Sequence, residues 1–339
     1  MAAKQKIIYI FFISFFFLVG ILFFGWQFFN KSNSGFLNPF VSEKKEAVVE
    51  KPLLKYSFVN IKNRGGKPSK IKLEKILRKN NGFTSFLFSY LSNDRKVTGL
   101  LHLPDGEAKK PIIVMLRGYV DINEYQTGIG TRPAGEYYAK EGFITIAPDY
   151  LGYGGSDMPP QGNIWEERFL RHVAVQDLFA SLPTLPNADT DHIFLWGHSN
   201  GGMESLAALE ISGKDYPTVL WAPVSAYFPY DVLYYLNEAE DKGKALRKEL
   251  ANFEKDYDVD NYSIATHMDW IKAPVQLHQG SSDPYIPLSW SDELASVLKE
   301  NANKVNYFVY PGTDHNMRPS WDTIVKRDVE FFNSFLKNK

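Results

Sequence analysis

A five-residue motif near the middle of the chain sets narrow limits on the local backbone. Residues 197–201 read Gly-His-Ser-Asn-Gly, directly after the apolar run at 193–196 and before a helix-forming stretch at 203–209. This order predicts a buried strand, a sharp turn and a helix. Glycine fills both outer positions because side chains do not fit at the flanks of such a turn. We therefore expect the hydroxyl of Ser199 to stand clear of the sheet. The backbone N–H of Asn200, which opens the helix, should point at the same spot.

A serine hydroxyl is a weak nucleophile unless a base takes its proton and a third group orients that base. Of the 7 histidines, only His315 lies far enough toward the C-terminus to follow an acid on a late strand. It belongs to a turn at 310–316, after a strand-like run at 306–309. The order predicts Ser199 as nucleophile and His315 as its base. The alternative for His315 is an ordinary surface loop.

Asp283 is the candidate for the third group. The apolar run at 274–278 predicts a buried strand, and the turn after it, at 279–284, contains this carboxylate. Asp283 would hold the imidazole in the required tautomer and stabilise its charged form. The alternatives are an Asp that only caps the turn, and Asp314 as the acid. Asp314 is adjacent to His315 in sequence and could not easily reach the ring.

A tetrahedral intermediate also needs two hydrogen-bond donors for its oxyanion. The Asn200 N–H is one. A continuous apolar strand at 111–116 is followed by Arg117, Gly118 and Tyr119, and Gly118 permits close backbone approach. We predict the Tyr119 N–H as the second donor, with the Tyr119 hydroxyl, or a plain turn without a role, as alternatives.

From Phe83 onward, strand and helix patterns alternate. The runs at 83–90 and 97–103 predict antiparallel edge strands around a turn at 93–94. Further strands are expected at 143–147 and 219–221, and helices near 134–141, 165–182 and after 286–288. This alternation predicts an α/β fold with a mostly parallel central sheet and helices on both faces.

These motifs, taken together, resemble the α/β-hydrolase superfamily, and most closely its prolyl oligopeptidase-like catalytic domains, the dipeptidyl aminopeptidase and acylaminoacyl peptidase group. The resemblance spans residues 83–339 and rests on the segments 117–119, 148–154, 197–202, 280–283 and 314–315. It implies a serine hydrolase that cleaves amide or ester bonds of a peptide or small acyl substrate through an acyl-enzyme. It also implies a Ser-His-Asp triad and no cofactor, and it favours a peptidase over a carboxylesterase.

The chain departs from that family in two ways. Arg117 stands where the family usually has histidine, before the first glycine of the oxyanion loop. The family's β-propeller, which selects substrates by size, needs several blades of ~40 residues each. The segment before Phe83 is too short for one, and the chain shows no internal repeat.

Residues 226–270 interrupt the alternation and predict a small cap insertion over the active site. Its aromatic residues at 227–230 and 234–236 would either bind an apolar or proline-like group or pack against the core. Glu238 and Glu240 would either hold a free amine of a peptide or form a solvated face.

The N-terminus predicts a membrane anchor. Residues 7–29 are almost entirely apolar and aromatic, which is long enough to span a bilayer, and Lys4 and Lys6 precede them. We expect a single-pass protein of the cell membrane with its catalytic domain on the extracytoplasmic side. A cleavable signal peptide is the alternative. The predicted organisation is an anchor at 1–30, a tether and extension at 31–82, and a catalytic domain at 83–339.

Composition excludes several classes. The chain has no cysteine, so disulfides, thiol chemistry and cysteine-based metal sites are impossible. Its net charge is −1, without a basic stripe, which gives no support for nucleic-acid binding, and we expect no metal site. The glycines at 152–155 lack the Gly-Lys-Ser/Thr of a phosphate loop. A non-catalytic binding module on the same fold, and acyl transfer to an acceptor other than water, remain alternatives.

Overall fold

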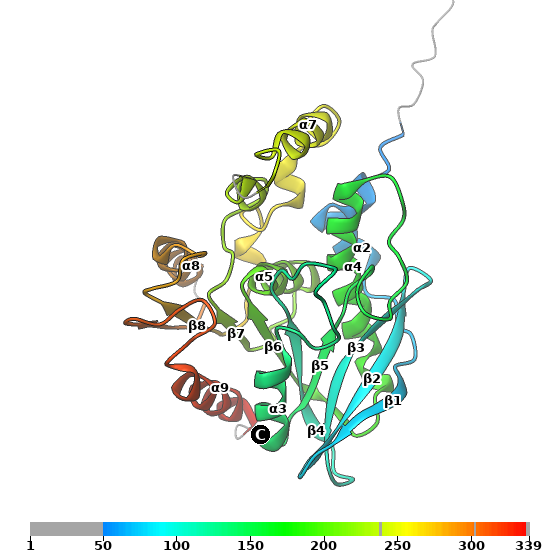
Figure 1. The fold of residues 1–339 in the computed structure, drawn as a ribbon, viewed down its shortest axis with the longest axis vertical. Coiled ribbons are helices and arrows are strands. Elements are labelled where there is room, and N and C mark those ends of the chain that lie inside the picture. The colour runs from blue at the N-terminus through cyan, green and yellow to red at the C-terminus, as the bar shows by residue number, and fades with distance from the viewer. Residues whose placement is uncertain (1–49, 237–238, 302, 337–339) are drawn as a thin grey trace, which may run out of the picture. The chain divides into compact units, whose positions relative to one another are not determined.

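A nine-stranded sheet runs through the residues that the computed structural model describes, 50–236, 239–301 and 303–336 (Figure 1). Its strand order is β1-β2-β3-β5-β4-β6-β7-β8-β9. The strands are β1 (Lys72–Lys79), β2 (Phe83–Ser92), β3 (Arg95–Pro104), β4 (Lys110–Leu116), β5 (Ile144–Pro148), β6 (Ala188–His198), β7 (Thr218–Trp221), β8 (Val275–Gly280) and β9 (Val305–Tyr310).

The sheet is antiparallel at one end and parallel elsewhere. β1, β2, β3 and β5 pair antiparallel in succession, and β5, β4, β6, β7, β8 and β9 pair in parallel. Residues 112–116 of β4 and all of β5 are buried, as strands covered on both faces require. The prediction of an α/β-hydrolase fold with a mostly parallel sheet is confirmed.

Helices cover both faces of the sheet (Figure 1). On one face α3 and α9 pack against each other and against the strands, and on the other face α4 and α5 do so. Helix α2 packs against α5, and α8 packs against β8 and β9. The helices are α2 (Phe58–Arg64), α3 (Arg132–Lys140), α4 (Ile164–Ser181), α5 (Asn200–Ser212), α6 (Tyr230–Leu233), α7 (Lys244–Phe253), α8 (Leu288–Glu300) and α9 (Trp321–Leu336).

The hairpin of β2 and β3 forms as predicted, but these two are not edge strands. Asn93 and Asp94 both have positive φ, 46° and 59°, which suits the tight two-residue turn that joins Ser92 to Arg95. The edge is β1, and β3 pairs with β5. Strand β1 was not predicted, because seven of its eight residues are exposed. The segment therefore lacks the alternation of apolar and polar residues that indicates a strand.

Residues 51–82 belong to the same compact unit as the sheet, which spans Lys51–Lys339. The predicted domain boundary at Phe83 therefore lies inside this unit. Phe58 and Ile61 of α2 are fully buried. Arg64 at the end of α2 donates two hydrogen bonds, of 2.7 and 2.9 Å, to the carboxylate of Asp177 on α4, which is itself fully buried. These contacts explain why the unit begins before the alternating pattern does.

The insertion expected at 226–270 lies between β7 and β8 and contains α6, α7 and two short 3-10 helices, Val259–Tyr262 and Met268–Trp270. One of its aromatic residues packs against the core, and three others do not. Phe228 is buried and packs edge-on against Trp165 and Phe169 of α4. The three tyrosines at 227, 230 and 234 are each about half exposed.

The predicted membrane anchor, and Glu238, lie outside the described residues. Within the described ranges, no helix has the length and apolar character needed to cross a bilayer. Glu240 is exposed.

Candidate active site

Ser199 occupies a strained turn between β6 and α5. Its φ of 55° and ψ of −122° place a non-glycine residue in a region that L-residues rarely adopt. Three backbone hydrogen bonds hold it there: its N–H donates to Trp221 O, and its carbonyl accepts from the N–H groups of Gly202 and Val224. The turn is therefore anchored to β7 and the segment after it.

The glycines around Ser199 are required by close packing. A Cβ at Gly201 would lie 1.9 Å from the carbonyl oxygen of Leu116, at the end of β4. At Gly197 it would lie 2.4 Å from the carbonyl oxygen of Gly201, and at Gly202 it would lie 2.4 Å from Pro223. Because no side chain fits these spaces, the motif brings α5 directly against the ends of β4 and β7.

His315 pairs with Asp283 across the loops that follow β9 and β8. His315 Nδ1 lies 2.8 Å from Asp283 Oδ2. The other carboxylate oxygen of Asp283 accepts the N–H groups of Tyr285 and Ile286, at 2.8 and 3.0 Å. Burial acts to raise the pKa of Asp283, but the hydrogen bonds from His315 and Ile286 outweigh it and lower the pKa. An ionised carboxylate only accepts, so Nδ1 carries the proton of this hydrogen bond, and Nε2 is the ring nitrogen that does not face Asp283.

Asp314 is not the partner of His315 in this structure. Its Oδ1 accepts the backbone N–H groups of Asn316 and Arg318, at 2.9 and 2.8 Å, and so closes its own turn.

His198 connects the His315 loop to the Ser199 turn. Its Nε2 lies 2.9 Å from the carbonyl oxygen of His315, and the two rings are 4.7 Å apart between centroids. A carbonyl only accepts, so Nε2 of His198 is the donor. The residue immediately before Ser199 thus contacts His315 directly. Sequence reasoning gave His198 no role, since a histidine inside the turn motif carries no signal of what its ring contacts.

Gly118 and Tyr119 follow β4 and lie beside Ser199. A Cβ at Gly118 would be 3.0 Å from Ser199 Cβ and 3.5 Å from Ser199 Oγ, so glycine lets the backbone lie this close without a tight contact. The side chain of Tyr119 is 73% exposed. Asn200 begins α5, where the first N–H groups have no partner within the helix. The predicted donors therefore come from two segments that both adjoin Ser199.

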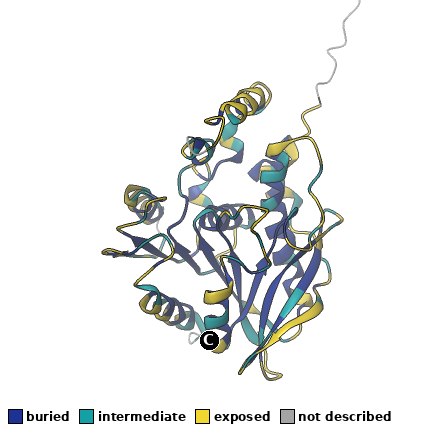
Figure 2. Ribbon diagram, viewed as in Figure 1, coloured by how far each residue is buried: buried dark blue, intermediate teal, exposed yellow. Residues whose placement is uncertain are grey.

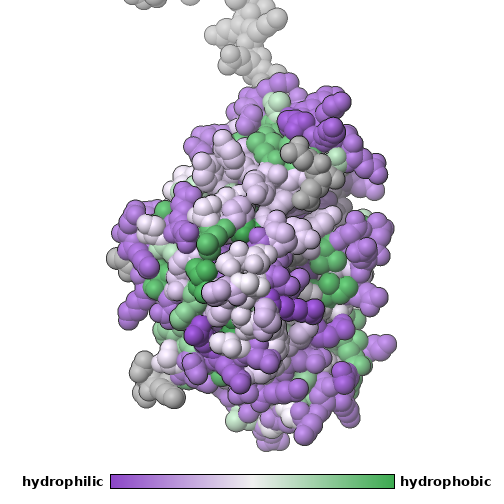
Figure 3. Space-filling model, turned by 60° about the vertical axis from the view of Figure 1, so that its left-hand side comes forward, coloured by the Kyte–Doolittle hydropathy of each residue, from purple (hydrophilic) through white to green (hydrophobic). Residues whose placement is uncertain are grey.

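A groove of about 550 Å³ opens between the insertion and α8. Ser225, which lines it, directly follows Val224, whose N–H is bonded to Ser199. We call it the tyrosine groove; its lining is Ser225, Ala226, Tyr227, Tyr230, Leu233, Tyr234, Ala265, Met268, Trp290, Glu293, Leu294 and Val297. Figure 3 brings the α8 side of the molecule forward and shows hydrophobic patches among hydrophilic side chains on that face. A helix was expected after 286–288, but the sequence did not predict that its residues line a groove. Their spacing along the helix is that of any helix packed on a core.

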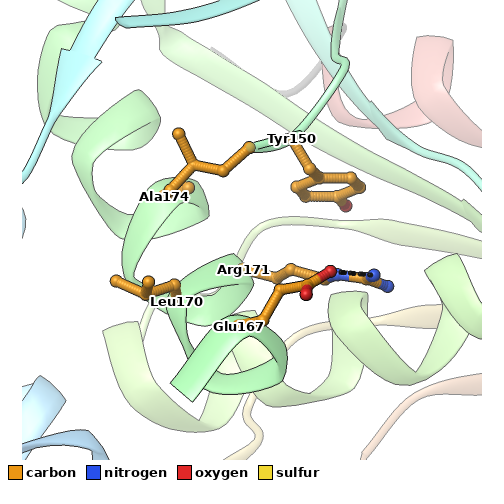
Figure 4. Close-up of a pocket in the computed structure, with 6 residues that line it drawn as sticks. Tyr150, Glu167, Leu170, Arg171 and Ala174 are labelled. Atoms are coloured by element: carbon orange, nitrogen blue, oxygen red, sulfur yellow. Dashed lines mark ion pairs between the residues drawn. The ribbon is translucent and has the colours of Figure 1, made fainter. Parts of the chain in front are cut away.

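A second cavity lies between α4 and the loop after β5. Figure 4 shows the ring of Tyr150 above the Arg171 guanidinium, which faces the Glu167 carboxylate. Its volume is about 10 Å³, enough for a single water molecule at most, so it is not a substrate site. In the described part of the chain, no cluster of His, Asp and Glu is arranged to hold a metal ion.

Comparisons with known proteins bear on the family and the fold. The prolyl oligopeptidase family matches residues 133–339. Dipeptidyl peptidase family member 6 of Caenorhabditis elegans is 22% identical over 236 residues, which cover 66% of this chain and 30% of that protein. The chain therefore spans less than a third of the length of this curated relative.

Two solved structures illustrate the likeness in fold. Acetyl xylan esterase 1 from Thermoanaerobacterium has a TM-score of 0.59 at 18% identity, with 83% of this chain and 94% of that chain covered. The acylaminoacyl peptidase of Pyrococcus horikoshii has a TM-score of 0.55 at 22% identity, with 74% of this chain and 41% of that chain covered.

Proposed function

The chain belongs to the prolyl oligopeptidase family, and from that premise we propose that it is a serine hydrolase whose triad is Ser199, His315 and Asp283. The observation that carries the proposal is the 2.8 Å pair of His315 Nδ1 and Asp283 Oδ2, held beside the strained Ser199 turn through His198. A bound imidazole whose second nitrogen is free supplies the base that a serine hydroxyl needs.

In this mechanism Ser199 Oγ attacks an ester or amide carbonyl and His315 Nε2 takes its proton. The imidazolium that forms is stabilised by the Asp283 carboxylate, whose lowered pKa keeps it ionised. The N–H groups of Asn200 and Tyr119 stabilise the oxyanion. His315 then protonates the leaving group. In the second half of the reaction His315 takes a proton from water, which attacks the acyl-enzyme, and His315 returns the proton to Ser199 Oγ as the serine leaves.

The test is covalent labelling. A fluorophosphonate probe should label the wild-type chain and fail to label Ser199→Ala. Ser296→Ala, an exposed serine on α8, is the matched control and should label as the wild type does. Equal labelling of wild type and Ser199→Ala contradicts the proposal, because another residue then reacts with the probe. Failure to label either protein leaves a non-catalytic binding module as the function.

We propose a peptidase as the first substrate class and a carboxylesterase as the second. Family membership supports the peptidase. The likeness in fold to acetyl xylan esterase 1 supports the esterase as the second candidate. Parallel kcat/KM measurements on p-nitrophenyl acyl esters and aminoacyl-p-nitroanilides decide between them. A peptidase should cleave both, whereas a carboxylesterase should cleave only the esters.

We also propose that residues 7–29 anchor the protein in the cell membrane, with the catalytic unit on the extracytoplasmic side. The length and apolar composition of that run support the proposal. The full chain should sediment with membranes and resist alkaline carbonate extraction, and a protease added to intact cells should remove the catalytic unit. Full recovery in the soluble fraction would contradict the anchor.

A further inference from the structure

Arg117 is a buried cation in an unusual setting, with only 3% of its surface exposed. Its guanidinium lies over the rings of Tyr153 and Tyr125, 4.2 and 4.4 Å from their centroids, and 5.4 Å from the ring centroid of Tyr150. No carboxylate of the described residues forms an ion pair with it; its Nη2 donates instead to the carbonyl oxygen of Asp149, at 3.2 Å. The aromatic rings compensate part of the cost of burying this charge.

The other terminal nitrogen reaches back to the backbone of the next residue. Arg117 Nη1 donates to the carbonyl oxygen of Gly118, at 2.9 Å. In a trans peptide the C=O and the following N–H point in opposite directions. A guanidinium that holds the Gly118 carbonyl on one side therefore turns the Tyr119 N–H to the other side.

The peptide that Arg117 holds lies next to the nucleophile. A Cβ at Gly118 would be 3.5 Å from Ser199 Oγ, so the backbone at Gly118 borders the Ser199 hydroxyl. The Tyr119 N–H has no hydrogen-bond partner among the residues that the structure describes, and an unpaired donor at this point is what a developing oxyanion requires.

We propose that Arg117 is a positioning residue, which fixes the orientation of the Gly118–Tyr119 peptide so that the Tyr119 N–H faces the oxyanion. The inference rests on the proposed function of Ser199. Arg117 touches neither substrate nor Ser199 and acts only through the peptide it holds.

The surroundings of the guanidinium are rigid, as this role requires. Tyr125 Oη donates to Asp149 Oδ1 at 2.6 Å, and Tyr153 Oη donates to the carbonyl oxygen of Val120 at 3.3 Å. The Asp149 carboxylate accepts further hydrogen bonds from the hydroxyls of Thr98 and Thr127, at 2.6 and 2.9 Å. The guanidinium is thus fixed in a frame that joins the loops after β4 and β5.

Lysine cannot replace arginine here. The planar guanidinium donates to two carbonyls at once and stacks on aromatic rings, whereas an ammonium is a single strongly hydrated point charge. The two terminal nitrogens of the guanidinium bond the carbonyl oxygens of Gly118 and Asp149 and so link these two residues.

The experiment compares Arg117→Met and Arg117→Lys with wild type on a p-nitrophenyl ester, with kcat calculated per site titrated by fluorophosphonate. We expect kcat to fall about 10- to 100-fold in both variants, with KM within about 2-fold, because the donor acts mainly in the transition state. The Ki of a trifluoromethyl ketone, which forms an oxyanion on the serine, should rise by a similar factor.

Arg78→Met is the matched control, because it removes the same kind of side chain from the exposed edge strand β1, which is separated from β6 by four strands of the sheet. It should keep kcat within about 2-fold. An unchanged kcat per titrated site in both Arg117 variants, with only a lower thermal midpoint, would mean that Arg117 is merely structural and would overturn the inference. If Arg117→Met does not fold, Arg117→Lys alone decides. Activity that persists in Ser199→Ala would instead refute the proposed function, so the two failures are distinguishable.

Discussion

His198 shows how a single buried ring can hold two loops of a site. Burial, together with the nearby His315, lowers the pKa of His198 to about 4, so the ring is neutral at pH 7. Its Nε2–H is then committed to the carbonyl oxygen of His315. The loop that follows β9 is in this way fixed to the residue before Ser199.

We expect His198→Leu to lower kcat/KM about 10-fold, because the His315 carbonyl loses its donor and the imidazole loses its fixed position. His198→Gln keeps a donor of similar reach and should recover most of the activity. The measurement is ester hydrolysis per titrated site in the three proteins. Equal activity in wild type and His198→Leu would show that the contact does not position the base.

His102 should make the folded protein less stable as the pH falls. Burial lowers its pKa to about 4 from the ordinary value of 6.5, so the unfolded chain binds its proton more readily than the folded one. Stability from this group is fully present above pH 6.5 and is lost as the pH falls from 6.5 to about 4. The loss is on the order of 3 kcal/mol. Urea unfolding across this window should show a shallower decline for His102→Gln than for wild type, and parallel declines would contradict the assignment.

At the scale of elements, an ion pair between Arg64 and Asp177 adds to the buried contacts that fasten α2 to the rest of the unit. Asp177 on α4 is fully buried, and its carboxylate is held by Arg64, by the Lys67 N–H and by the Ser92 hydroxyl. Removing the cation leaves an uncompensated buried charge. Arg64→Met should therefore lower the free energy of unfolding by about 3 kcal/mol, measured by urea denaturation. Arg78→Met on the exposed strand β1 is the control and should stay within about 0.5 kcal/mol of wild type.

The elements that the sequence predicted are those with a strong local signal. Buried parallel strands such as β4 and β5 are continuous apolar runs, and the turn at 197–201 has a fixed residue pattern. β1 could not be predicted, because an edge strand keeps its charges in water and loses the alternation that marks a strand.

The candidate site was predictable to the same extent. Ser199, Asp283 and His315 follow from their order and from the turns that contain them. The Arg117 bond to Gly118 and the His198 bond to His315 depend on where side chains point, which spacing alone does not determine. The division of the insertion's aromatic residues between core and groove depends in the same way on tertiary packing.

At the scale of the whole molecule, every residue of the proposed triad and oxyanion site lies in the compact unit Lys51–Lys339. A chain that begins at Lys51 should therefore keep kcat/KM on a soluble ester within about 2-fold of the full chain. A chain that begins at Phe83 lacks α2 and β1, removes Arg64, the ion-pair partner of Asp177, and should unfold at a markedly lower temperature. Loss of activity in the chain that begins at Lys51 would show that residues before it contribute to catalysis.

The outermost strand has a consequence for how copies of this protein behave in a crowded solution. Half of the residues of β1 are lysine or arginine, its backbone is irregular at two points, and Figure 2 shows much of it exposed. The unpaired N–H and C=O groups of a flat outermost strand can pair with a strand of a second molecule, and positive charges and an irregular backbone disfavour that pairing. We therefore expect the charges and irregularities of β1 to reduce aggregation.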